Sequence, residues 1–389
     1  MSSPATPSPN SVRPSAIGRI EGFWQRVSEG RAIDDLWAQF AADARSSYSF
    51  YGKDVDWDEI NKLPRWKQPF RVAGQFFWAL MTKLSPARRV LLLLALLFLL
   101  LAALGGNNGR PNAHGGGGDV NWEFFSAVLL LLLLSLELAD RVIMKRDLEI
   151  AREIQTWLVP SQAPKIPGAE VAFWTRPQNS VAGDYYDAFY PTANGAASSK
   201  LMLVMADVAG KSVPAALLMA TLQASLRTIA SESVPLPQLA ERLNQYACST
   251  SLGGQRFTTA VLAEYDPATR ELQYVNAGHN SPVIRHKNGG TMRLESASLP
   301  LGITPEAQFT AFSVQLQPED TLVLFTDGVV EAFNAAGEEF TDARWIGVIR
   351  AMPLLPAGDT LKYLLKTVEE FVGATRQSDD ITCLVMRCQ

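Results

Sequence analysis

The stretch MADVAGKSVPAALLMA, residues 205–220, places Gly-Lys-Ser between an apolar strand-like run and a helix-like run. A phosphate-binding loop has the pattern G-x-x-x-x-G-K-[ST], which requires glycine at position 205. The chain has Met205 there, so the loop lacks the tight turn that aims backbone N–H groups at phosphate. We therefore interpret residues 210–212 as a turn, with Ser212 near the start of a helix. The chemically interesting residue of the stretch is then Asp207.

The sequence from about residue 168 onward is typical of a globular domain. Short β-rich runs alternate with helical segments, and DPATR and KNGG have the composition of hairpin turns. Many hairpin-linked strands with a few helices predict an antiparallel α+β fold, not a doubly wound parallel sheet. The predicted strands are 169–175, 185–190, 200–206, 257–265, 271–276, 281–286, 320–326 and 381–387. The predicted helices are 213–231, 236–250, 342–351 and 359–373.

Four segments of this domain carry acids at predicted strand ends or turns. A buried carboxylate needs a partner, because an unpaired buried charge is costly. Oxygen donors without His or Cys clusters favour Mg²⁺ or Mn²⁺ over zinc, and two such ions can activate a water and polarise a phosphoryl oxygen. A single Asp-Gly is more commonly a turn, and spacing alone does not bring the four segments together. The acids are Asp184 and Asp187 in AGDYYD, Asp207 in MADVAG, Asp327 and Glu331 in LFTDGVVEA, and Asp379 and Asp380 in QSDDIT.

The order of seven motifs in this domain closely resembles the metal-dependent protein phosphatase (PPM) superfamily. The most similar branch is that of the bacterial stage II sporulation E-like phosphatases, which includes sigma-regulator types that dephosphorylate anti-sigma-factor antagonists. The resemblance covers about residues 148–389 and implies an αββα sandwich, two Mn²⁺ or Mg²⁺ ions and a metal-bridging water as nucleophile instead of a side chain. The motifs are GDYYD, ADVAGKSVPAALLMA, FTTAVLAEYD, NAGHNSPVI, LPLGI, LFTDGVVEAFN and SDDIT.

The resemblance also implies metal-binding roles, position by position. Asp207 would bridge both metals, and the backbone carbonyl of Val208 would be a neighbouring ligand. Asp184 would bind one metal, and Asp327 and Asp379 would bind the other. The family often has Gly-Gly before the first acid, where this chain has Ala-Gly, and Gly-Lys-Gly where this chain has Gly-Lys-Ser. Both departures leave the acids intact and put loop geometry in doubt more than metal binding.

Four further residues are weaker candidates. Asp380 follows the acid that the family uses, and Asp187 is the second acid of its motif. His279 in NAGHN is either a general acid near the leaving oxygen or, as we favour, a turn histidine hydrogen-bonded to backbone. Arg176 either contacts phosphate or, as we favour, is a surface arginine at a strand end.

Two leucine-rich runs predict a membrane hairpin. Val90–Leu104 is uninterrupted apolar sequence and Phe124–Leu136 nearly so. Each is shorter than the roughly 20 residues that a bilayer core needs, although flanking residues extend them; the alternative is a buried globular hairpin. The Gly-rich connector carries one arginine, whereas basic residues flank both outer ends, at 71, 83, 88, 89, 141, 145 and 146. The positive-inside rule then predicts both termini in the cytoplasm of a bacterium, with the protein a multi-pass inner-membrane protein.

Composition and sequence pattern predict how the whole chain is divided into parts. The predicted parts are a disordered Pro/Ser-rich terminus (1–17), a cytoplasmic helical or juxtamembrane region (18–88), the hairpin (89–139), a helical linker (140–160) and the phosphatase-like domain (161–389). An apolar stripe of Ile150, Ile154 and Trp157 makes the linker either a dimerisation helix or a passive tether.

Charge and cysteine content narrow the function class. A net charge of −4 argues against a general nucleic-acid binder, and three cysteines without a Cys-x-x-Cys fit reduced thiols. We therefore expect a membrane-tethered Ser/Thr phosphatase acting on a bacterial regulatory phosphoprotein, such as an anti-sigma-factor antagonist. The rival is a non-catalytic membrane signalling adaptor that uses a phosphatase fold, against which the intact acids argue. A metal-dependent nuclease or phosphodiesterase lacks a basic surface signature.

Overall fold

The computed structural model describes residues 64, 68–105, 121–193, 195–210, 213–250 and 256–389. The chain divides into two compact units, residues 1–140 and 141–389. The predictions for the terminus 1–17, for most of the region 18–88, for the connector 106–120 and for the loop residues 211–212 lie outside the described residues.

The first unit contains helix α4 (Gln68–Lys83), helix α5 (Pro86–Gly105) and the beginning of α6 (Trp122–Leu158). α5 and α6 pack closely where their side chains are small: the Ser126 hydroxyl donates to the Ala95 carbonyl at 2.9 Å, and both residues are buried. At one end Arg88 forms ion pairs of 3.1 Å with Glu137 and 2.6 Å with Asp140. These contacts make α5 and the start of α6 a helical hairpin.

Most leucines of this hairpin are exposed, as a surface that faces lipid would require. Within the described residues, length and composition allow two helices to cross a membrane: Pro86–Leu104 and Val213–Ala230. The second of these is α7, whose buried side chains belong to the core of the C-terminal domain. The second predicted span, Phe124–Leu136, forms the early part of α6, which continues without a break to Leu158. The sequence prediction had separated this span from the linker, and the structure joins them in one helix of 37 residues, about 55 Å long.

Two five-stranded sheets form the centre of the C-terminal domain, and every strand pair in them is antiparallel. One sheet has the order β1-β12-β11-β8-β9 and the other β10-β7-β6-β5-β2. A short β3-β4 hairpin (Thr192–Ala193, Ala196–Ala197) lies beside them. The first sheet contains β1 (Ala169–Arg176), β8 (Val283–Arg285), β9 (Thr291–Arg293), β11 (Thr321–Phe325) and β12 (Ile381–Cys388); the second contains β2 (Tyr185–Phe189), β5 (Leu201–Val208), β6 (Thr258–Asp266), β7 (Glu271–Ala277) and β10 (Phe312–Gln315).

Alternating side chains of the strands fill three hydrophobic layers. Leu203 and Met205 of β5 face Leu384 and Met386 of β12 in the layer between the sheets. The residues between them in sequence point outward, because successive side chains of a strand face opposite ways. These outward residues pack against helices on each outer face, so both sheets are covered.

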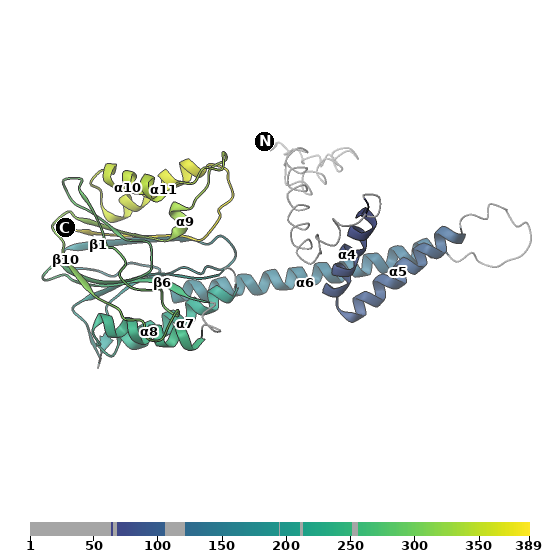
Figure 1. Ribbon diagram of the computed structural model, residues 1–389, viewed down its shortest axis with the longest axis horizontal. Helices are drawn as coiled ribbons and strands as arrows, with labels where there is room; N and C mark the ends of the chain where they lie inside the picture. The colour runs from purple at the N-terminus through teal and green to yellow at the C-terminus, as the bar shows by residue number, and fades with distance from the viewer. Residues whose placement is uncertain (1–63, 65–67, 106–120, 194, 211–212, 251–255) are drawn as a thin grey trace, which may run out of the picture. The chain divides into compact units, whose positions relative to one another are not determined.

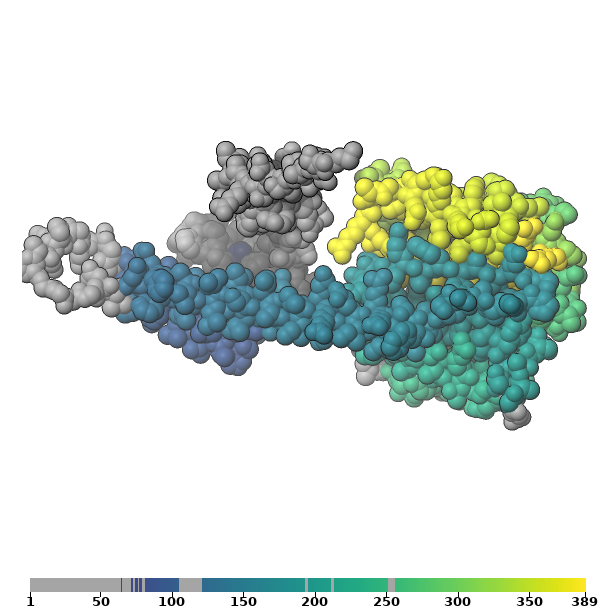
Figure 2. Space-filling view, turned by 180° about the vertical axis from the view of Figure 1, so that it is seen from behind, coloured from purple at the N-terminus to yellow at the C-terminus, as the bar shows by residue number. Residues whose placement is uncertain are grey.

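Helices α7 (Val213–Ala230) and α8 (Leu236–Thr250) cover the β5-containing sheet, and α10 (Asp342–Ala351) and α11 (Ala357–Val372) cover the other. One-turn helix α9 (Asp327–Val330) follows β11. The layers are visible in Figure 1, and Figure 2 shows the yellow C-terminal helices and the green-teal segment on opposite sides of the domain. The predicted αββα sandwich is confirmed.

Candidate functional site

The strand pairing brings the four acidic segments to one end of the sandwich. β2 begins where β5 ends, since Tyr185 pairs with Ala206, so Asp184 and Asp207 lie at the same end of one sheet. In the other sheet β11 ends where β12 begins, since Phe325 pairs with Cys383. The segments that follow β11 and precede β12 carry Asp327, Asp379 and Asp380.

Hydrogen bonds join the two sheets at this end. The hydroxyls of Thr326 and Thr382 donate to Asp184 Oδ2 at 2.9 and 2.6 Å, although Asp184 belongs to the other sheet. The Gly183 N–H donates to Asp380 Oδ2 at 2.7 Å. The Asp184 segment and the Asp379–Asp380 segment are therefore held together across the sandwich.

Two glycines allow the close approach of these segments. A Cβ on Gly183 would lie 3.2 Å from the Val208 carbonyl oxygen and 3.7 Å from Asp207 Oδ1. The Val208 carbonyl and the Asp207 carboxylate therefore lie beside the segment that carries Asp184. A Cβ on Gly328, directly after Asp327, would overlap the Asp380 carbonyl oxygen. Residues larger than glycine would push the acidic segments apart.

The carboxyl group of Asp184 has a strongly perturbed pKa. The residue is only 4% exposed, and its pKa is raised well above its usual value. Burial is the largest cause; repulsion by the charges of Asp207 and Asp380 adds to it, while hydrogen bonds from Thr382 and Thr326 act in the opposite direction. Carboxylates that repel one another in a buried place are stabilised by a bound cation.

The donor chemistry of the cluster fits a divalent metal. The predicted ligands offer carboxylate oxygens and one backbone carbonyl, which suit Mg²⁺ and Mn²⁺. Within the part of the chain that the structure describes, no group of three or more His, Cys, Asp or Glu side chains is close enough to hold an ion. The assignment of Asp184, Asp207, Val208, Asp327 and Asp379 as ligands therefore stays a prediction.

The Asp380 carboxylate accepts backbone hydrogen bonds from the segment that precedes β2. Its Oδ1 accepts the Gln178 N–H at 2.6 Å and its Oδ2 accepts that of Gly183 at 2.7 Å. Burial raises the pKa of Asp380, and these backbone donors oppose the rise. Because both of its oxygens accept these hydrogen bonds, Asp380 connects the segment before β2 to the segment before β12.

Asp187 lies in β2 and is fully buried. Arg227 of α7 donates to both of its oxygens at 2.9 Å, and the Tyr185 hydroxyl donates at 2.6 Å. The Arg227 guanidinium also lies 3.9 Å from the centre of the Phe189 ring. These partners satisfy the carboxylate and connect α7 to β2.

His279 is buried next to β6, the strand that pairs with β5, which carries Asp207. Its Nδ1 lies 2.8 Å from the hydroxyl of Thr259, the residue that pairs with Asp207 across β5 and β6. Its backbone N–H donates to Asn276 Oδ1 at 2.9 Å. Burial lowers the pKa of His279 to about 4, with the Phe325 backbone acting in the opposite direction. The ring is thus neutral near pH 7 and lies between the two sheets.

Arg176 ends β1 and is 41% exposed. Its Nε donates to Gln377 Oε1 at 2.7 Å, and its Nη1 lies 3.3 Å from Glu369. These partners fit the favoured interpretation of a surface arginine at a strand end.

Sequence reasoning missed Gln155, near the end of α6. Its side-chain amide donates to the Ala182 carbonyl at 2.7 Å and accepts the Ala182 N–H at 2.9 Å. Ala182 comes two residues before Asp184, and a cavity beside this contact is lined by Gln155, Thr156, Asp184 and Tyr186 among others. No motif marks the glutamine, because its partner is backbone. Thr326 and Thr382 were also missed, although Thr326 directly precedes Asp327 and Thr382 comes two residues after Asp380.

Comparisons with known proteins agree with this arrangement. Residues 197–389 match the family described as Stage II sporulation protein E (SpoIIE). Protein IcfG of Synechocystis sp. is 28% identical over 272 residues, which cover 62% of this chain and 41% of that protein. Phosphoserine phosphatase RsbU of Bacillus subtilis is 26% identical over 194 residues, which cover 50% of this chain and 56% of RsbU. The chain thus spans about half the length of these relatives.

Among solved structures, the SiaA-PP2C domain of Pseudomonas aeruginosa has a TM-score of 0.56 to this chain at 22% identity. The match covers 64% of this chain and 99% of that domain. The C-terminal domain therefore has the PP2C-type fold.

Proposed function

Because residues 197–389 belong to the stage II sporulation protein E family, we propose that the chain is a metal-dependent protein serine/threonine phosphatase. The observation that carries the proposal is Asp184, a buried carboxylate with a raised pKa, repelled by Asp207 and held between the sheets by two threonines. A cation bound where the acidic segments meet would stabilise the charged form of this carboxylate.

The chain's own residues would hold and orient the metal centre. Asp207 and the Val208 carbonyl would offer oxygens from β5, and Asp327 and Asp379 would offer oxygens from the other sheet. The Thr326 and Thr382 hydroxyls fix one oxygen of Asp184, which leaves the other for a metal. Two bound divalent ions supply an activated water and offset the charge of the phosphoryl oxygens.

The substrate and location are further parts of the proposal. The name of RsbU, phosphoserine phosphatase, supports a phosphorylated regulatory protein as substrate, such as an anti-sigma-factor antagonist. The exposed leucines of α5 and α6 support a membrane hairpin, and the basic flanks support a cytoplasmic catalytic domain. On α6, Ile150 and Ile154 are about half exposed and Trp157 is 74% exposed, which supports a homodimer through the linker.

The alternative function, a signalling adaptor without turnover, requires no metal. The experiment is phosphate release from a panel of phosphoserine proteins by the full chain in detergent, with and without Mn²⁺. We expect Mn²⁺-dependent release that Asp207→Asn lowers at least a hundredfold while the circular dichroism spectrum stays the same. Glu331→Gln, which changes an acid of the same domain outside the proposed ligand set, is the matched control. Release that is absent with every substrate, or equal in Asp207→Asn and the unaltered chain, would contradict a metal-dependent phosphatase.

A further inference from the structure

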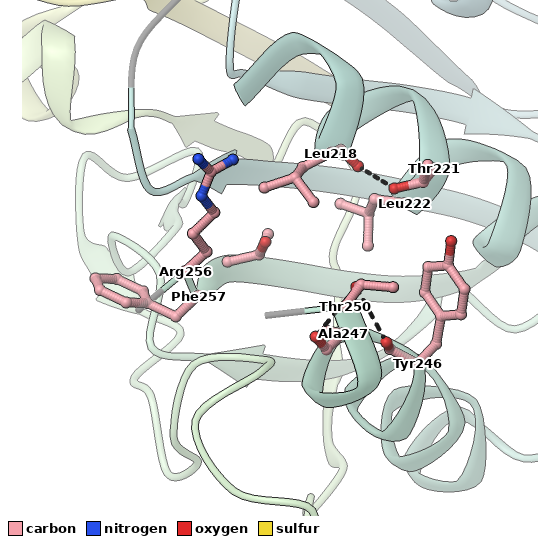
Figure 3. Close-up of a pocket in the computed structure, with 9 residues that line it drawn as sticks. Leu218, Thr221, Leu222, Tyr246, Ala247, Thr250, Arg256 and Phe257 are labelled. Carbon is pink, nitrogen blue, oxygen red and sulfur yellow. Dashed lines mark hydrogen bonds between the residues drawn. The ribbon is translucent and has the colours of Figure 1, made fainter. Parts of the chain in front are cut away.

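A shallow groove lies between α7, α8 and the beginning of β6 (Figure 3). Its apolar surface comes from Leu218 and Leu222 of α7, Ala247 of α8, and Phe257. Figure 3 shows the Arg256 guanidinium at one end of the groove, beside Leu218, and the Tyr246 ring at the other end.

One end of the groove adjoins the end of β5, where the predicted ligands Asp207 and Val208 lie. Thr258, which lines the groove, pairs with Val208, and the Ala209 N–H donates to the Phe257 carbonyl at 2.9 Å. Arg256 comes two residues before Thr258, so its backbone lies about 7 Å along the chain from the residue that pairs with Val208. Arg256 is therefore close enough to meet a peptide residue that neighbours a phosphorylated side chain at the predicted metal site.

Two aromatic side chains that line the groove are partly exposed. Phe257 is 38% exposed and Tyr246 is 36% exposed. An apolar surface next to a reaction site is typical of a place where another molecule binds.

Arg256 supplies the charge of the groove. Its side chain is partly buried and forms no hydrogen bond or ion pair with any residue that the structure describes. Arg227 and Arg242, whose side chains are 42% and 37% exposed, both have carboxylate partners, Asp187 and Glu232. A partly buried guanidinium without an acid favours an anionic ligand, since guanidinium groups bind carboxylates and phosphates through paired N–H donors.

We propose that this groove binds the segment of the phosphoprotein substrate next to its phosphorylated residue. An acidic side chain of that segment pairs with Arg256, and an apolar side chain packs on Leu218, Leu222 and Phe257. The inference rests on the proposed function and names the substrate class of that site: phosphoserine or phosphothreonine segments with an acidic and an apolar neighbour.

The test uses the full chain in detergent with Mn²⁺ and two synthetic phosphoserine peptides of equal length. One peptide has Asp and Leu beside the phosphoserine, and the other has Asn in place of Asp. We expect the unaltered chain to prefer the acidic peptide about tenfold in kcat/KM, the size of one charge-assisted hydrogen bond, through a lower KM. Arg256→Glu removes or reverses this preference. The control is Lys362→Glu, which makes the same charge change on α11 at a side chain 81% exposed, and it keeps the preference.

Three outcomes would overturn the inference. The first is equal use of both peptides by the unaltered chain, and the second is an unchanged preference in Arg256→Glu. The third is a change of mass by light scattering in Arg256→Glu with no change in KM, which would make the groove a contact between copies. If neither peptide nor p-nitrophenyl phosphate is hydrolysed, the proposed function fails. Fluorescence anisotropy of the labelled peptides then still decides whether Arg256 selects the acidic one.

Discussion

His279 is an example of a protonation state set by burial at a single residue. The ring is 4% exposed, and Nδ1 is engaged by Thr259. Its pKa of about 4 lies below the ordinary value of 6.5, so the folded protein favours the neutral ring. The unfolded chain takes up a proton at this residue as the pH falls from 6.5 toward 4. The contribution of His279 to stability is therefore complete above pH 6.5 and is lost as the pH falls through that window.

The prediction at this scale concerns His279→Gln. Between pH 7 and pH 5.5, the unaltered chain should lose about 1 kcal/mol more of its free energy of unfolding than the variant loses. Pulse proteolysis of the full chain in urea at both pH values measures the difference. Equal losses in the two proteins would show that His279 titrates normally. His286→Gln, at a partly exposed histidine paired with Asp320, controls for general effects of removing a histidine.

The end of helix α6 is hydrogen-bonded to the segment that carries Asp184. Gln155→Leu removes both hydrogen bonds to Ala182 while keeping a side chain of similar size. Because Ala182 precedes the Asp184 segment, we expect the Mn²⁺ concentration for half-maximal activity to rise about tenfold, the size of one to two lost hydrogen bonds. Glu149→Ala, an exposed position on the same helix, is the control. A metal titration identical for Gln155→Leu and the unaltered chain would mean that α6 does not influence the site.

Elements with a long periodic pattern could be predicted from sequence. Helices α8 and α10 begin and end where predicted, and α7 and β12 differ from their predictions by one residue at an end. β9 and β10 were missed because segments of three and four residues are too short for an alternating pattern to be recognised. The acids of the candidate site could be identified from sequence motifs. The hydrogen bonds from Thr326 and Thr382 to Asp184 could not, because they join residues 142 and 198 positions apart and no local sequence pattern encodes such pairs.

The whole molecule is predicted to cross the membrane twice, and thiol labelling tests this. The three cysteines are replaced by serine or alanine, and single cysteines are introduced at Ile20, Ala113 and Glu370. In intact cells a membrane-impermeant thiol reagent should label position 113 alone, while lysed cells should show labelling at all three positions. Labelling at 20 or 370 before lysis, without labelling at 113, would contradict the predicted orientation.

The position of β12 has a consequence for how the protein is made. This strand lies between β1 and β11, yet about 200 residues separate it from β1 in the chain. At about 5–20 residues per second, the ribosome finishes β12 roughly 10–40 s after β1. Until then β1 has no partner strand, whereas the strands of the other sheet, all between residues 185 and 315, are already available. The acids before β2 and after β11 are held in register only once β12 is inserted. A nascent chain should therefore carry a formed β5-containing sheet and an unfinished candidate site.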